Sequence, residues 1–131
     1  MTNLKNQTSS KTQTPNGNKY DLEERSLVFA KDVRSFVSRL PRTIANAEDI
    51  KQLVRSSGAV GANYIEANES LGKKDFVMRL RISRKEAKES RYWLTLLNIG
   101  GTAQLDTERQ RLSNESRELM LILTSIINKS F

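Results

Sequence analysis

Five basic side chains recur at steps of three and four residues within the stretch from residue 73 to residue 99. They are Arg81, Arg84, Lys85, Lys88 and Arg91. In an α-helix such residues share one side, and the rise from the first to the last is about 15 Å. A positive face of that length can contact several phosphates, and each contact adds to a salt-dependent affinity. The pattern therefore predicts a surface that binds RNA or DNA without regard to base sequence.

This basic face has two other interpretations. It is an ordinary solvated surface if Glu86, Glu89 and neighbouring subunits balance its charge. It is a docking surface if the partner is an acidic protein. The distribution of charge favours an anionic partner, because the chain carries a net +7 and residues 71–100 hold +5 of it, with eight basic and three acidic residues.

Three carboxylates have a placement that suggests chemistry. Glu66 lies in a segment rich in small residues, and Glu86 and Glu89 lie one helical turn apart. If their helices pack together, these groups could bind a divalent metal or act as acid and base. The chain has no His and no Cys, which removes imidazole ligands, thiol nucleophiles and disulfides. We therefore expect no catalysis, no metal and no cofactor, and a structural role in which Glu66 or Glu89 accepts hydrogen bonds from Arg or Tyr across an interface.

The polar and aromatic neighbours of these groups also have two interpretations each. Asn63 can fix the register of two packed helices or contact RNA, and we expect it to fix register. Tyr92 and Trp93 follow Arg91 and could stack on unpaired bases. Since Trp is usually buried for most of its surface, we expect Trp93 to pack beside Leu94 or at a subunit contact.

The elements that position these residues are four predicted helices. Apolar residues at helical spacing place them at residues 21–40, 46–68, 73–99 and 107–129. Asp21, Asn46 and Thr107 are the predicted N-caps. Pro41 ends the first helix, and the glycines at 100 and 101 end the third. Because no alternating strand pattern is found, we expect an all-α fold, an antiparallel up-down-up-down four-helix bundle.

Two glycines, Gly58 and Gly61, lie inside the second predicted helix. Each costs about 1 kcal/mol relative to alanine in a helix interior. That cost suggests a compensating role, and we expect close approach of a neighbouring helix at these positions.

The last predicted helix is apolar on nearly all sides in its second half, which reads LMLILTSII. Nine residues are too few to cross a bilayer, so burial against another subunit is expected. The sequence therefore predicts a homo-oligomer. The expected interface residues are Trp93, Leu121, Ile122 and Ile126.

The chain divides into a tail and a bundle. Residues 1–19 contain only Met1 and Leu4 as large apolar side chains, so we expect a disordered, polar, basic tail ahead of a bundle at residues 20–131. No run approaches the 18 apolar residues of a membrane span. The lack of Cys fits a reducing compartment, and we expect a cytoplasmic protein.

Three segments of the middle of the chain carry a family resemblance: residues 58–67 (GAVGANYIEA), residues 74–76 (KDF) and residues 82–94 (ISRKEAKESRYWL). Over residues 20–130 the chain resembles the bacterial four helix bundle proteins, first associated with reading frames in intervening sequences of 23S ribosomal RNA genes. The accessory variability protein of diversity-generating retroelements is a more distant relative.

The resemblance implies a four-helix subunit that assembles into a ring-like homopentamer. It also implies nucleic-acid binding through a basic surface and no enzymatic activity. An alternative function is a scaffold that docks a protein, for instance a reverse transcriptase or another element-encoded partner.

Overall fold

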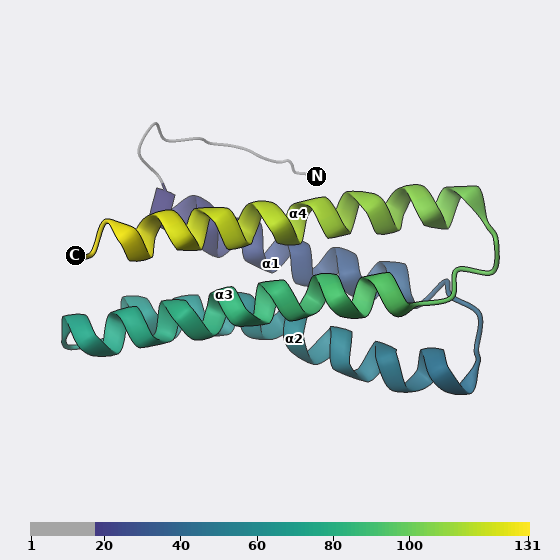
Figure 1. Ribbon diagram of the computed structural model, residues 1–131, viewed down its shortest axis with the longest axis horizontal. Coiled ribbons are helices and arrows are strands. Elements are labelled where there is room, and N and C mark those ends of the chain that lie inside the picture. The colour runs from purple at the N-terminus through teal and green to yellow at the C-terminus, as the bar shows by residue number, and fades with distance from the viewer. Residues whose placement is uncertain (1–17) are drawn as a thin grey trace.

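The computed structural model describes residues 18–131, and this part of the chain is folded into four α-helices without a strand (Figure 1). They are α1 (Asn18–Val37), α2 (Ile44–Asn68), α3 (Lys73–Leu96) and α4 (Ala103–Asn128). The predicted all-α class and the number of helices are confirmed. The expected disordered tail lies outside the described residues, except that Asn18 and Lys19 form the start of α1.

The helices lie side by side along one long axis. Neighbouring pairs in contact are α1 with α2, α2 with α3, α3 with α4, and α4 with α1. The α1–α2 and α3–α4 connections lie at the right end in Figure 1, and the α2–α3 connection lies at the left end with the chain's C-terminus. Each connection is short, so consecutive helices are neighbours.

Buried apolar side chains occupy the predicted helical faces. The apolar residues at helical spacing in the first predicted helix are all buried: Leu22, Phe29, Val33 and Phe36 on α1, and Leu40 after its end. Residues at the same spacing are buried on α3, where they are Leu80, Ser83, Ala87, Ser90 and Leu94, and Leu97 is buried just after the helix. Phe76 at the start of this row is half-buried and packs against the core. A spacing of three and four residues therefore identified the core side of these helices.

Small residues bring α2 and α3 close together. The Ser83 hydroxyl of α3 donates to the backbone carbonyl of Val60 in α2 at 2.6 Å. The hydroxyls of Ser56 and Ser90 lie 2.9 Å apart across the same contact, and both serines are fully buried. Larger side chains at these positions would hold the two backbones apart, so the serines allow this approach while satisfying one another's hydroxyls.

The helix starts differ from the prediction. Thr43 is the N-cap of α2 and accepts a hydrogen bond from the amide of Asn46 at 3.0 Å, so Asn46 lies inside the first turn. Helix α4 begins at Ala103 with Thr102 as its N-cap, which places Thr107 one turn inside the helix. Helix α1 already includes residues before Asp21. The three predicted N-caps are therefore wrong, because Asn, Asp and Thr also occur within first turns and in tertiary contacts.

The third helix is shorter than expected. It ends at Leu96, and Leu97 is extended with φ −64° and ψ 139°. Gly100 and Gly101 follow with φ of 70° and 72°, a conformation that glycine adopts without strain. None of the four described helices combines the length and the apolar character that a bilayer span needs.

Candidate nucleic-acid interface

The five predicted cations follow one another along the second half of α3, and two of them contact α4. We call Arg81, Arg84, Lys85, Lys88 and Arg91 the basic stripe. Four of them are exposed, and Arg84 is half-buried beside α4. The regular helix through this segment positions them, so the spacing predicted their common face correctly.

The surface between the basic stripe and α4 is hollowed into an open groove of about 420 Å³. Its lining residues are Arg81, Arg84, Lys85, Lys88, Met120 and Thr124. Four of these side chains are cations and none is a carboxylate. A groove with this lining attracts anions, because four of its six lining side chains are cations.

Two of the cations are held by uncharged groups of α4. Arg84 Nη1 donates to the Thr124 hydroxyl at 3.4 Å, and Arg91 Nε donates to the Ser113 hydroxyl at 3.4 Å. A hydroxyl orients a guanidinium without neutralising it. Both arginines therefore keep their full charge for a ligand.

One end of the groove meets the last residue of the chain. The Arg81 guanidinium lies over the Phe131 ring, 5.8 Å from its centre, and Lys73 Nζ lies 5.4 Å from the same centre. Such exposed cation–π contacts are worth about 0.5–1 kcal/mol. They place Arg81 at the edge of the groove.

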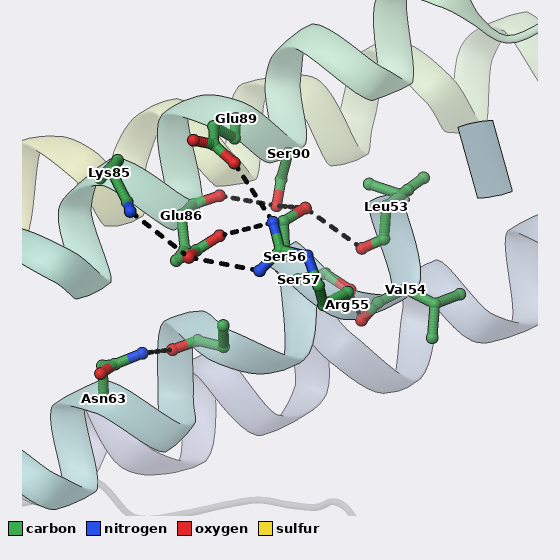
Figure 2. Close-up of polar contacts among 11 residues, drawn as sticks. Leu53, Val54, Arg55, Ser56, Ser57, Asn63, Lys85, Glu86, Glu89 and Ser90 are labelled. Carbon is green, nitrogen blue, oxygen red and sulfur yellow. Dashed lines mark hydrogen bonds and ion pairs between the residues drawn. The ribbon is translucent and has the colours of Figure 1, made fainter. Parts of the chain in front are cut away.

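Glu86 and Glu89 of α3 both lie against Arg55 of α2, and Lys85 lies beside Glu86 (Figure 2). Glu86 is only 6% exposed, and its Oε1 and Oε2 lie 3.3 and 3.4 Å from the guanidinium of Arg55 on α2. Glu89 accepts a hydrogen bond from the same guanidinium at 3.3 Å. Within the stripe, Lys85 Nζ reaches Glu86 Oε2 only at 4.0 Å. Glu86 and Glu89 are therefore balanced mainly by Arg55 of α2, and Lys85 is the only stripe residue that forms an ion pair within the described part of the chain.

Glu86 has a structural setting. Ser90 donates to the Glu86 backbone carbonyl at 2.9 Å, next to the Ser56–Ser90 contact. The Oε1 atom of Glu86 is buried and accepts no hydrogen bond from the described residues. The Arg55 guanidinium balances its negative charge as an ion pair. Glu66 is exposed on α2 and lies outside this cluster. The expectation that three carboxylates meet applies to Glu86 and Glu89 alone.

Asn63 links α2 to α3. Its Nδ2 donates to the carbonyl of Ala59 in its own helix at 2.9 Å, and its Oδ1 accepts from Arg79 of α3 at 3.3 Å. This geometry agrees with a role in helix register.

Within residues 18–131 no group of three or more acidic side chains is placed to hold a metal ion.

The two aromatic residues that follow the stripe have different environments. Trp93 is half-buried and packs against the core, with its indole N–H buried and without a hydrogen-bond partner among the described residues. Tyr92 is 59% exposed. The two rings meet edge to face with their centres 5.0 Å apart. Packing of Trp93 was expected, but the exposure of its neighbour was not.

The residues expected at an oligomer interface are only partly exposed. Leu121 is 45% exposed, while Trp93, Ile122 and Ile126 are half-buried and pack against the core of their own chain. The neighbouring Leu119, Leu123 and Ile127 are buried. The apolar end of α4 is therefore covered on more sides by its own chain than its sequence suggested.

Sequence reasoning missed the contributions of the other helices. Arg55, which pairs with Glu86 and Glu89, lies more than 30 positions away from them in the sequence. Met120 and Thr124 form the far wall of the groove. Only the packing of α3 against two neighbours brings these residues to the site, and no local pattern marks them.

Comparison with known proteins adds a family and a fold relative. The family model described as 23S rRNA-intervening sequence protein matches residues 18–125. A crystal structure of a protein of unknown function from the S23 ribosomal protein family of Bacteroides thetaiotaomicron is similar, with 30% sequence identity and a TM-score of 0.70. The similarity covers 85% of this chain and 98% of that one. No functionally curated protein matches this chain.

Proposed function

Because the chain belongs to the family of 23S rRNA-intervening sequence proteins, we propose that it is a non-enzymatic helical-bundle protein that binds RNA or DNA through the basic stripe of α3. The observation that carries this proposal is the separation of charge across α3. Four of its cations line an open groove toward α4, whereas Glu86 and Glu89 are paired with Arg55 of α2.

The mechanism is electrostatic. Arg and Lys side chains neutralise phosphates and release the counterions that surround the nucleic acid, so affinity falls as salt rises. Contacts of this kind carry no base specificity. Arrays of stripes in an oligomer would raise the overall affinity through effective concentration.

The test compares stripe variants with a variant of equal charge change elsewhere. Fluorescence anisotropy would follow the binding of labelled single-stranded RNA and duplex DNA over a series of salt concentrations. Lys88→Ala should lower the magnitude of the slope of log affinity against log salt by about 0.7 for a single strand. Lys51→Ala on α2, whose side chain is exposed, is the control and should leave the slope nearly unchanged. Absence of binding to either ligand at low salt would refute the proposal.

We further propose that the subunit is an antiparallel up-down-up-down bundle and that subunits form a homo-oligomer, on family resemblance a homopentamer. The positions of the helix connections support the alternating order. Exposed apolar residues on α1 and α4, among them Leu27, Val28 and Leu121, support association.

A second candidate function is docking of a protein such as a reverse transcriptase. An open groove of about 350 Å³ between α1 and α2 favours it, with Leu27 and Ile65 about half exposed in its lining. A protein partner bound there should still co-purify with the chain after nuclease treatment. Ile65→Glu should abolish this co-purification. A partner that is retained by this variant would contradict docking at the groove.

A further inference from the structure

Tyr92 extends the exposed line of the basic stripe by one turn. Arg81, Lys85, Lys88 and Tyr92 follow one another at steps of four, three and four residues, and all four are exposed. Such steps keep residues on one side of a helix. The rise from Lys88 to Tyr92 is about 6 Å, so the ring lies one helical turn from the nearest cation.

The ring of Tyr92 packs against the ring of Trp93. It meets the ring of Trp93 edge to face at 76°, with the centres 5.0 Å apart, while 59% of Tyr92 remains exposed. Trp93 in turn packs against the core. A ring held in this way loses little conformational freedom when a ligand stacks on it, so less of the stacking free energy is spent on ordering it.

We infer that the basic stripe selects single-stranded nucleic acid and that an unpaired base stacks on Tyr92 while Lys85 and Lys88 contact the adjoining phosphates. This inference rests on the proposed function and names the form of nucleic acid that the site takes. An unpaired base presents a free face to an aromatic ring, whereas a duplex encloses its bases between neighbouring base pairs. Cations alone would accept either form. The exposed ring is thus the feature that separates the two.

The experiment uses the full chain and its own tryptophan as a probe. Trp93 is the only tryptophan, and it contacts Tyr92 directly. Oligo(dT), oligo(U) and a duplex of equal length would each be titrated while tryptophan emission and anisotropy are recorded. We expect both single strands to change the Trp93 emission and to bind more tightly than the duplex. The DNA and RNA arms show which sugar the site prefers.

Three variants separate stacking from charge. Tyr92→Ala should weaken single-strand binding about 5- to 150-fold and leave duplex binding unchanged. The slope of affinity against salt should stay the same, because the ring neutralises no phosphate. Tyr92→Phe should bind like the parent. Lys88→Ala should reduce the slope for both forms.

The outcomes distinguish this inference from the function on which it rests. Binding by the parent that Tyr92→Ala leaves unchanged, or an equal loss for duplex and single strand, would overturn stacking while the electrostatic function stands. A change in oligomer mass for Tyr92→Ala would also overturn it, because it would assign the ring to a subunit contact. No binding of any nucleic acid by the parent would remove the proposed function itself.

Discussion

The side chain of Asn46 exchanges two hydrogen bonds with the backbone of Asn98. Its Oδ1 accepts from the Asn98 amide at 2.9 Å, and its Nδ2 donates to the Asn98 carbonyl at 2.8 Å. The same Nδ2 also donates to the Pro41 carbonyl at 2.9 Å. Asn46 is buried, so a single amide ties the α1–α2 connection to the α3–α4 connection at one end of the bundle.

Asn46→Ala should lower the free energy of unfolding by about 2–4 kcal/mol, because it removes the three hydrogen bonds that a buried side chain makes. Urea unfolding followed by circular dichroism would measure the change. Gln52→Ala, at an exposed position of the same helix, is the control and should change stability by less than about 0.5 kcal/mol. A loss of unfolding free energy as small as that of the control would show that the Asn46 hydrogen bonds do not stabilise this end of the bundle.

The two glycines of α2 should respond oppositely to alanine. A Cβ at Gly61 would lie 2.8 Å from Ser26 Oγ and 3.3 Å from Ser26 Cβ, so the hydroxyl must turn away and Ser26 of α1 must give by a few tenths of an ångström. A Cβ at Gly58 would meet only the end of the Arg34 side chain at 3.5 Å. Gly61→Ala should therefore destabilise the protein, and Gly58→Ala should stabilise it by about 0.5–1 kcal/mol through helix propensity. Thermal unfolding of both variants checks the pair, and equal shifts would contradict the close approach at Gly61.

Arg55→Ala should destabilise the bundle by about 1–2 kcal/mol, because it leaves the buried carboxylate of Glu86 without its main counter-charge. The cost is moderate because the Arg55 side chain is 52% exposed. Combining it with Glu86→Gln should restore part of the loss, since a buried amide carries no charge. A double-mutant cycle in urea measures the coupling, and strictly additive effects would argue against it.

Alkaline pH should reveal the burial of Tyr64. Burial raises the pKa of this phenol above its usual value of 10, against a hydrogen bond with Asn68 that lowers it. The stabilising effect of the neutral phenol is complete below the unfolded pKa, and it is lost as pH rises through the folded pKa. In an absorbance titration of the tyrosines, Tyr64→Phe should remove a component that ionises late. A difference between parent and Tyr64→Phe that ionises at the usual pH of a phenol would contradict a raised pKa.

Leu121→Glu should dissociate the proposed oligomer, because a charge replaces an exposed leucine on the apolar end of α4. Light scattering of the parent should give a multiple of the 14.9 kDa subunit mass, which is fivefold for a pentamer. Leu71→Glu, in the turn between α2 and α3, is the matched control and should keep the parent's mass. A parent of subunit mass would contradict the oligomer.

Much of the fold was predictable because helical periodicity is a local property. The apolar spacing of residues 22–40 identified the buried face of α1, and the spacing of the five cations identified their common side of α3. The helix starts were less predictable. Asn is a residue type that is common at N-caps, but the side-chain amide of Asn46 is used in a contact with Asn98, 52 positions away.

The sequence by itself determined the four helices, their apolar faces, the family and the positive side of α3. Only the tertiary structure decided where the acids of α3 go, which of Tyr92 and Trp93 stays exposed, and which α4 residues complete the groove. The reason is that a helix repeat specifies which residues share a face, whereas the partner of each face depends on how the helices pack. A glutamate is ordinarily found on the surface, whereas Glu86 is buried because α2 packs Arg55 against it.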